Sequence, residues 1–282
     1  MKIILRARAE RIVLAGKDRV AGVWATVKGA GEDDEPEQHY FEADTVVSAI
    51  NPTITFEKLL EGVRVVDNVR KKVVARDSDS GSMKINVKLS GVPAFKGVPG
   101  LVAPGPQHQG TIHIAPSVEY ILKALSDYRE GRSSDRPILE ITIPSVVDNT
   151  LAPEGHHVMN IFVQSVRFSN VDWKKERVAY FRNVVLPLMQ EYMPNITKII
   201  KGVQILAPQD LEQMFGMVGG NIFHGGMGLD QLWWNRPAPG LADYRTPIHG
   251  LYLTGAGMHP GGGVCGAAGY NTARVILADL KS

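Results

Sequence analysis

The sequence predicts a mixed protein of the α/β and α+β classes, in which a domain is inserted between two ends that belong together. Three observations support this prediction. Strand-like segments separated by turn residues fill residues 1–52. Strands and helices then alternate, which favours a mixed or antiparallel sheet with helices on one side. The chain ends in a strand, a glycine-rich turn and a helix.

Composition describes a soluble globular chain without a broad charged surface. The chain has 282 residues, of which 44% are hydrophobic and 21% charged, and its formal net charge is +2. This length supports one large domain or two intimate ones. The small net charge gives no basis for nucleic-acid binding. No apolar run reaches the roughly 18–20 residues of a transmembrane helix. The single cysteine indicates a reducing compartment and precludes an internal disulfide.

The first 52 residues predict three strands. Residues 2–15 and 20–28 form a hairpin around a turn at 16–19, where glycine and aspartate tolerate turn geometry. Residues 41–49 form a buried strand that stops at Asn51 and Pro52. The opening residues lack the long apolar region of a signal peptide, so we expect a cytoplasmic protein. A domain that opens directly on a strand is expected to have lost its beginning.

The middle of the chain predicts the elements of an α+β domain. Helices are expected at residues 53–62, 116–130, 173–193 and 208–215, and strands at 84–92, 139–144, 157–166 and 199–207. Pro187 should kink or break the longest helix, because proline lacks the backbone donor and its ring clashes with the preceding turn. The densest basic stretch, residues 70–76, is expected to be a solvated face.

The segment that bears on function follows a predicted strand at residues 251–253 and precedes a predicted helix at 271–280. Seven of the fifteen residues from Gly255 to Gly269 are glycine. Each glycine costs conformational entropy, so this density needs a reason. One reason is tight packing of helix on strand. The other is a backbone brought close to a ligand, which is favoured because free N–H groups and the positive end of the helix dipole face one spot.

The apparent dinucleotide fingerprint in this turn is misleading. Gly261, Gly263 and Gly266 satisfy G-x-G-x-x-G. The true fingerprint needs a second strand after the helix and an acidic residue about 20 positions on, and the chain ends at Ser282. The turn is therefore expected to close a site that is opened elsewhere. A reduced flavin suits the N-terminal end of a helix, because the flavin carries negative charge near N1 and C2=O and this end of the helix dipole is positive.

Short segments along nearly the whole chain form a recognisable set. They are ADTVVS at 43–48 with Asn51-Pro52, KINV at 84–87, IPS at 143–145, TLAP at 150–153, GGNIFH at 219–224, LDQL at 229–232, RP at 236–237, YR at 244–245, GLYL at 250–253 and HPGGGV at 259–264. The set resembles the phytoene desaturase-like FAD-dependent oxidoreductases, and within them the pyridine nucleotide-disulfide oxidoreductase domain-containing protein 2 group. HPGGGV is its most specific member.

The resemblance implies FAD as cofactor and an incomplete, Rossmann-like FAD-binding domain with an inserted mixed-sheet substrate domain. Residues 1–52 and 245–282 would form the partial FAD-binding domain, and residues 53–244 the substrate-binding domain. The implied cofactor-binding residues are Gly255, Ala256 and Gly257 near the phosphates and ribitol, His259, Pro260 and Gly261, and then Gly262, Gly263 and Val264, whose N–H groups would face the isoalloxazine. Tyr270 departs from the arginine of many relatives.

The resemblance also implies that a part of the family's length is missing. Family members begin with a strand–GxGxxG–helix that binds the ADP half of FAD, and no segment here matches it. We therefore expect a truncated product, one half of a split enzyme or a fragment, which binds FAD weakly on its own. The expected partners are a small hydrophobic or unsaturated substrate and either an N-terminal partner chain or a second copy. For a eukaryotic source the resemblance implies the mitochondrial matrix.

The candidates for catalysis are few. His259 lies beside the turn, where it either relays a proton or fixes the turn through a hydrogen bond. His224 and Asp230 would form an acid–base pair over a substrate, although loop residues of these types often cap the backbone instead. Cys265 opens the last helix, and a small buried role is favoured over a reactive thiol.

The remaining aromatic and histidine residues point to no further chemistry. Trp233 and Trp234 either line an apolar pocket or pack in the core. The other histidine pairs, His108 with His113 and His156 with His157, do not have the spacing of a metal site.

Two functions remain open from the sequence. The first is a flavin oxidoreductase that removes hydride from a C–C or C–N bond, with flavin N5 as the acceptor. The second is a non-catalytic or partner-dependent subunit that retains the fold. The missing fingerprint favours the second function, and the intact HPGGGV turn opposes it.

Overall fold

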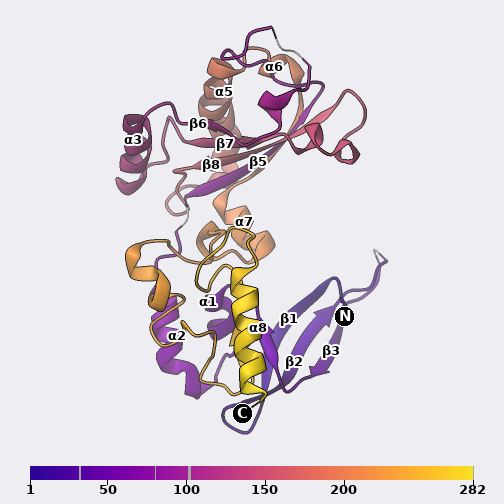
Figure 1. Cartoon of the computed structure of the whole chain (residues 1–282), viewed down its shortest axis with the longest axis vertical. Helices are drawn as coiled ribbons and strands as arrows, with labels where there is room; N and C mark the ends of the chain where they lie inside the picture. The colour runs from indigo at the N-terminus through magenta and orange to yellow at the C-terminus, as the bar shows by residue number, and fades with distance from the viewer. Residues whose placement is uncertain (32, 80, 101–102, 282) are drawn as a thin grey trace. The chain divides into compact units, whose positions relative to one another are not determined.

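Backbone contacts divide the chain into two compact units. Unit 1 contains residues 1–78, 216–218 and 222–282, and unit 2 contains residues 79–215 and 219–221. The computed structural model describes residues 1–31, 33–79, 81–100 and 103–281 (Figure 1). These boundaries lie after residue 78 and near residue 216, whereas the sequence placed them at 52 and 245. The reason is that residues 53–78 contribute Phe56, Leu60 and Val73 to the core of unit 1.

The first sheet of unit 1 is an antiparallel meander. Strands β1 (Ala7–Ala15), β2 (Arg19–Val27) and β3 (Glu37–Glu42) lie in that order, which confirms the predicted hairpin. Gly16 has φ +73° in the tight turn between β1 and β2, a conformation that glycine adopts without strain.

The strand expected at residues 41–49 is two strands in different sheets. The chain leaves β3 at Glu42, and β4 (Val46–Ser48) pairs in parallel with β10 (Leu251–Leu253), near the other end of the sequence. The Val46 N–H donates to the Gly250 carbonyl at 2.8 Å, which starts this pairing. The second sheet of unit 1 thus joins the start and the end of the chain.

Helices cover the core of unit 1. They are α1 (Pro52–Ile54), the π-helical turn η1 (Thr55–Leu59), the 3-10 turn η2 (Arg64–Val66), α2 (Asp67–Val74) and α8 (Ala267–Asp279), with two further 3-10 turns, η8 (Leu229–Gln231) and η9 (Trp233–Asn235). The basic stretch expected to be a solvated face forms α2. Lys71 and Lys72 are exposed as expected. Arg70 and Arg76, the other two basic residues, are half-buried instead, because their guanidinium groups donate to backbone carbonyls of the unit.

Unit 2 is built on a five-stranded sheet in the order β6-β7-β8-β5-β9. Its strands are β5 (Ser82–Leu89), β6 (Ile112–Ile114), β7 (Leu139–Thr142), β8 (His157–Gln164) and β9 (Ile200–Leu206). Every neighbouring pair is antiparallel, so the implied mixed sheet is corrected to an antiparallel one. Alternate residues of β5, such as Met83, Ile85 and Val87, are buried in one core.

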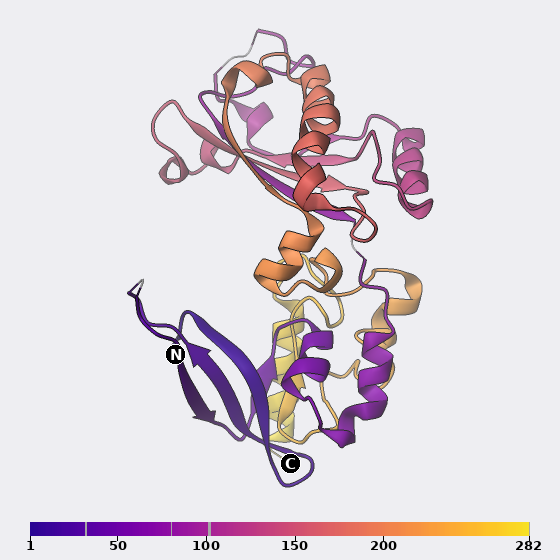
Figure 2. The ribbon, with the colours of Figure 1, turned by 180° about the vertical axis from the view of Figure 1, so that it is seen from behind.

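Helices pack on one face of this sheet (Figure 2). The helices of unit 2 are α3 (Val118–Arg129), α4 (Trp173–Tyr180), the π-helical turn η6 (Phe181–Val185), α5 (Leu186–Tyr192), α6 (Ile196–Ile199) and α7 (Pro208–Phe215). The 3-10 turns η3 (Pro106–His108), η4 (Pro144–Val146) and η5 (Asn149–Leu151) lie in its loops. A last turn, η7 (Val218–Gly220), has residues in both units.

The long helix predicted over residues 173–193 is interrupted as expected, although it does not end. The π-helical turn η6 separates α4 from α5, and Pro187 lies in the first turn of α5. Proline cannot donate to the preceding turn, so the local backbone changes its hydrogen-bond spacing at this point. Within the described part of the chain, none of the helices combines the length and apolarity that a bilayer crossing needs.

Candidate functional site

The residues from Gly255 to Gly269, which we call the glycine turn, connect β10 to α8 and include the first turn of α8. The Thr254 N–H donates to the Ser48 carbonyl at 2.9 Å, so the chain leaves the parallel strand pair directly into this segment. Two consecutive reverse turns follow, in which the Met258 N–H donates to Gly255 and the Gly261 N–H donates to Met258. The glycine turn is therefore an ordered segment fixed by its own backbone.

Three glycines of this segment are required by packing. A Cβ atom at Gly255 would lie 2.9 Å from the Ala49 carbonyl oxygen, and one at Gly257 would lie 2.6 Å from Pro52 Cδ. At Gly262 a Cβ would approach Phe223 Cδ1 to 2.7 Å. Contacts this short force a shift of the backbone or of the neighbour. The packing explanation for the glycine density is therefore right for this half of the segment.

The other half has no such contacts. Within the described part of the chain, a Cβ atom at Gly263, Gly266 or Gly269 would meet no heavy atom within 4 Å. Gly263 and Gly266 have φ of +116° and +70°, which explains their identity. Gly269 lies in the first turn of α8 with ordinary helical geometry, where glycine costs about 0.5–1 kcal/mol relative to alanine. Neither sterics nor φ explains Gly269.

A strained residue lies on the same exposed surface. Val264 has φ +55°, and its side chain is fully exposed. A β-branched residue at positive φ is an outlier that costs free energy, and no packing of its side chain compensates here. The exposed half of the glycine turn thus carries two unfavourable choices, Val264 and Gly269, that the fold of the described chain does not require.

Orphaned polar atoms surround the buried half. In the described part of the chain, four buried side-chain atoms have no hydrogen-bond partner near this turn: Asn51 Nδ2, His224 Nδ1, Thr254 Oγ1 and His259 Nδ1. They are close because Gly257 fits between Pro52 and His224, with its Cβ position 2.6 Å from Pro52 Cδ and 3.6 Å from His224 Cβ. Buried donors without partners are costly, so this cluster suits a polar ligand.

Two arginines lie beneath the turn. Arg236 has no exposed surface, and its guanidinium donates only to carbonyl oxygens, those of Phe223, Gly226 (2.9 Å), Gln231 (3.3 Å) and Ala256 (2.8 Å). Arg76 donates to the carbonyls of His224 and Pro237 and to Gln231 Oε1. Burial, reinforced by repulsion from Arg236, lowers the pKa of Arg76 to about 10. Burial also lowers the pKa of Arg236.

The expected pair of His224 and Asp230 is not formed. No hydrogen bond or ion pair joins them within the described residues, and Asp230 lies exposed in η8. Burial, followed by the charges of Arg236 and Arg76, lowers the pKa of His224, so its ring is neutral at pH 7. The alternative role of His259, in which its side chain fixes the turn through a hydrogen bond, is not seen among the described residues: its Nδ1 has no partner, and only its backbone carbonyl accepts from the Tyr244 hydroxyl, at 3.0 Å.

The predicted burial of Cys265 was wrong, and one of the two alternatives for Trp233 and Trp234 is ruled out. Cys265 is exposed and precedes α8, because the chain runs along the surface from Gly263 to Gly266. Trp233 and Trp234 do not pack in the core, since they are 46% and 71% exposed and their rings stack on each other at 6.0 Å between centroids.

Two other expectations can be placed on the structure. Tyr270 is exposed on α8 beneath the Arg274 guanidinium, at 5.8 Å from its centroid. In the part of the chain that the structure describes, no group of three His, Cys, Asp or Glu residues is arranged to hold a metal ion.

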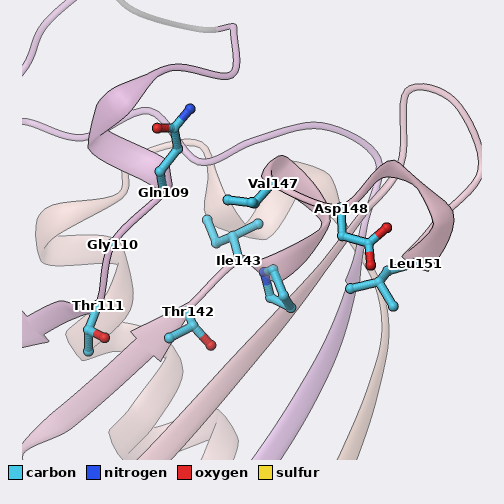
Figure 3. A pocket seen from close by; sticks show the side chains of 9 residues that line it. Gln109, Gly110, Thr111, Thr142, Ile143, Val147, Asp148 and Leu151 are labelled. Carbon is cyan, nitrogen blue, oxygen red and sulfur yellow. The ribbon is translucent and has the colours of Figure 1, made fainter.

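Unit 2 contains a surface pocket of about 560 Å³ beside the end of β7 (Figure 3). Its lining is partly apolar, and Asp148 provides its carboxylate. Hydrogen bonds from the Thr150 hydroxyl and N–H lower the pKa of Asp148, which keeps it ionised. The lining residues are Gln109, Gly110, Thr111, Thr142, Ile143, Pro144, Val147, Asp148 and Leu151. Sequence reasoning did not select this pocket, although the IPS and TLAP segments contain part of it.

Comparison with known proteins relates the chain to oxidoreductases. No protein-family model matches it. The chain is 40% identical over 243 residues to pyridine nucleotide-disulfide oxidoreductase domain-containing protein 2 of Rattus norvegicus, an alignment that covers 84% of this chain and 42% of the relative. The chain is a homologue of this oxidoreductase. This finding confirms the family resemblance that the HPGGGV turn indicated.

Two further similarities extend to nearly the whole chain. It is 27% identical over 285 residues to phytoene desaturase (lycopene-forming) of Pseudescherichia vulneris, covering 99% of this chain and 52% of the desaturase. The solved structure of an oxidoreductase from Methanosarcina mazei matches 98% of this chain and 49% of its own, with a TM-score of 0.52 and 16% identity, which bears on the fold alone. The chain thus spans about half the length of the curated relatives that it matches.

Proposed function

We propose that the chain contributes the flavin-contacting turn and the substrate-facing part of an FAD-dependent oxidoreductase of the dehydrogenase or desaturase type. The observation that carries this proposal is the exposed half of the glycine turn. Gly263, Gly266 and Gly269 present bare backbone with no neighbour within 4 Å, and Val264 is held exposed at positive φ. A flat ring system bound against this surface would explain why glycines and a strained, exposed valine occur here. The names of the relatives as oxidoreductases agree with this proposal.

The residues around the turn fit a flavin nucleotide. The orphaned atoms of Asn51, Thr254 and His259 are hydrogen-bonding groups that a polar ligand would satisfy. The first turn of α8 adds free N–H groups and the positive end of a thirteen-residue helix dipole. Gly255, Ala256 and Gly257 would hold the polar chain of the nucleotide, and the segment from Gly262 to Val264 would contact the ring.

The chain's own part in the reaction is positioning and electrostatics. A bound flavin supplies hydride acceptance at N5, from a C–C or C–N bond of the substrate. Arg236 fixes Ala256 from below, and Arg76 holds the His224 carbonyl, so the surface against the ligand is rigid. His224 is neutral at pH 7 and therefore adds no third positive charge at this point. No side chain needs to act as a catalytic base in this scheme.

Unit 2 is proposed to bind the substrate. Its pocket combines apolar side chains, such as Ile143, Val147 and Leu151, with the Thr142 hydroxyl and the Asp148 carboxylate (Figure 3). Such a lining accepts a small, largely hydrophobic or unsaturated molecule with one polar end.

The substitution Gly269→Leu tests the flavin proposal. The Cβ atom of leucine meets no atom of the described chain within 4 Å, and leucine is a better helix former than glycine, so we expect the thermal midpoint to stay or rise. The flavin affinity, measured by quenching of FAD fluorescence, should fall about tenfold or more because the side chain occupies the ligand's place. Ala273→Leu is the matched control, because Ala273 is exposed on the same helix one turn later. The proposal is wrong if the chain binds no FAD or if both variants bind it equally.

A further inference from the structure

The neighbouring backbone leaves specific room for the arginine pair, Arg76 and Arg236, beneath the glycine turn. A Cβ atom at Gly225 would lie 1.5 Å from Arg76 Nη2, so only glycine leaves room for this guanidinium. Arg236 reaches the Ala256 carbonyl, and its Nε lies 3.8 Å from the Cβ position of Gly261. One cation thus lies against the turn from Ala256 to Gly261, and a second lies behind it.

The pair lacks a counter-charge. In the described part of the chain, no carboxylate lies within 4 Å of either guanidinium, and the acceptors are carbonyl and amide oxygens without net charge. Arg70 shows the usual arrangement in the same unit. It also donates to three carbonyls, those of Phe56, Leu60 and Val63, but it has the carboxylate of Asp67 beside it. Buried charges are ordinarily paired, so the pair of Arg76 and Arg236 is incomplete.

A second feature, the side chain of Asn51 beside the glycine turn, also indicates a site for a ligand group. The Asn51 side chain is 2% exposed, and its Nδ2 donor has no partner among the described residues. Its Oδ1 accepts from the Thr53 N–H at 2.9 Å, which fixes the amide so that Nδ2 is the free end. One fully buried positive charge, Arg236, one half-buried positive charge, Arg76, and an unused donor indicate a site for an acceptor that carries negative charge.

We propose that Arg76 and Arg236 form the electrostatic half of an anion site at the glycine turn, and that an anionic group of the ligand supplies the missing counter-charge. This inference rests on the proposed flavin function and names the charge that the ligand must carry there. Two groups of a flavin nucleotide provide it: the phosphate, and the pyrimidine ring of the reduced flavin. The pair acts mainly through its field, since each guanidinium nitrogen already donates to a carbonyl or amide oxygen.

Gln231→Glu tests the proposal with little disturbance of the fold. Gln231 Oε1 accepts from Arg76 Nε at 3.4 Å, and the side chain is 8% exposed. The isosteric carboxylate supplies the counter-charge from within the protein, so the thermal midpoint of the free protein should rise or stay. Affinity for the anionic group should fall about tenfold or more, the order expected for one unit charge roughly 10 Å away at an effective dielectric constant of about 20.

Riboflavin, FMN and FAD, each oxidised and reduced, separate the two sources of charge. If the phosphate is bound there, Gln231→Glu weakens FMN and FAD and leaves riboflavin unchanged. If the reduced ring is bound there, the substitution weakens every reduced flavin and no oxidised one. If Gln231→Glu binds every one of these flavins as tightly as the wild type does, the anion site is wrong while the proposed flavin function stands.

Inorganic pyrophosphate tests the anion site without a flavin. It should raise the thermal midpoint of the wild type and raise that of Gln231→Glu less. The absence of both flavin binding and pyrophosphate stabilisation contradicts both proposals. Pyrophosphate stabilisation without flavin binding contradicts only the flavin function.

Removal of the charge gives an independent check. Arg76→Gln should reproduce the affinity loss, and Arg76→Lys should retain most of the affinity because it keeps the charge. Arg70→Gln is the matched control, since it removes a comparable set of carbonyl contacts from a cation that already has a carboxylate partner. Equal affinity losses in Arg76→Gln and Arg70→Gln overturn the proposal, because they show a structural effect only.

Discussion

At the scale of single residues, Arg236 organises the candidate site. Its guanidinium binds carbonyls from two stretches of chain, one at residues 223–231 and the other at Ala256 in the glycine turn. An arginine suits this task because five donors project from one rigid plane. One buried side chain therefore holds the segment before the turn against the turn itself.

Arg236→Lys should destabilise the protein by about 3 kcal/mol, because an ammonium cannot reach all of these carbonyls and leaves some of them buried without a donor. The measurement is the free energy of unfolding in urea. Arg245→Lys serves as control, since Arg245 is partly exposed and pairs with Asp243 and Asp279, where the loss should stay below about 1 kcal/mol. A loss in Arg236→Lys no larger than the control's would contradict this role.

At the residue scale, the sequence correctly predicted a special backbone turn, but it did not predict which side chains lie exposed at the surface. The glycine density near Gly255 does mark a special turn, and the structure divides it between packing and exposure. Cys265 was expected to be buried because of its residue type, and it is exposed. For Trp233 and Trp234, core packing was one of two alternatives, and both side chains are exposed. No local sequence pattern indicated the arginine pair, because contacts such as that of Arg76 with the Pro237 carbonyl join residues 161 positions apart.

At the scale of elements, the C-terminal end of α3 shows how one side chain anchors a helix. The Asp127 side chain is 5% exposed and accepts from Lys123, from Arg132 at 2.7 Å and from the Ser134 hydroxyl at 3.2 Å. The hydrogen bond from Lys123, followed by those from Arg132 and Ser134, lowers the pKa of Asp127. The carboxylate therefore ties α3 to the loop that leads to β7.

Asp127→Asn should cost about 1–3 kcal/mol at pH 7, because the charged acceptor of these hydrogen bonds is lost. A lowered folded-state pKa means that the carboxylate stabilises the fold above its unfolded value of about 3.9. That contribution disappears as the pH falls through the folded pKa. The unfolding free energies of the two proteins should therefore stay apart from pH 7 down to about pH 4, and they should converge as the pH falls further. A difference that does not depend on pH would refute this assignment.

The elements found from sequence were those with a strong internal pattern. The hairpin of β1 and β2, the strand β5 and the helices α3 and α7 follow from periodicity and turn residues. The helix α2 was missed because its charges masked the buried Val66 and Val73, which become apolar neighbours only in the folded unit. The three-residue strand β6 was missed because its pairing with β7 rather than its own pattern defines it.

At the scale of the whole molecule, the chain has two hydrophobic cores. The core of unit 1 gathers residues from both ends of the sequence, such as Phe56 and Leu253. The core of unit 2 joins its sheet to α4, η6 and α5 through residues such as Ile161 in β8 and Val185 in η6. The sequence predicted that the two ends of the chain belong to one domain, with boundaries at residues 52 and 245. The contact-based units instead divide after residue 78 and near residue 216, because the helices after Pro52 carry no marker of which core they enter.

Two separate cores lead to the last prediction. Ile161→Ala and Phe56→Ala should each cost about 2–5 kcal/mol, since both side chains are fully buried and each change leaves a cavity. Differential scanning calorimetry should resolve two transitions, with Ile161→Ala lowering one and Phe56→Ala the other. Flavin affinity should fall only for Phe56→Ala, near its own transition, because the glycine turn packs on the core of unit 1 through Met258. A single transition lowered equally by both substitutions would show that the two units unfold as one cooperative body.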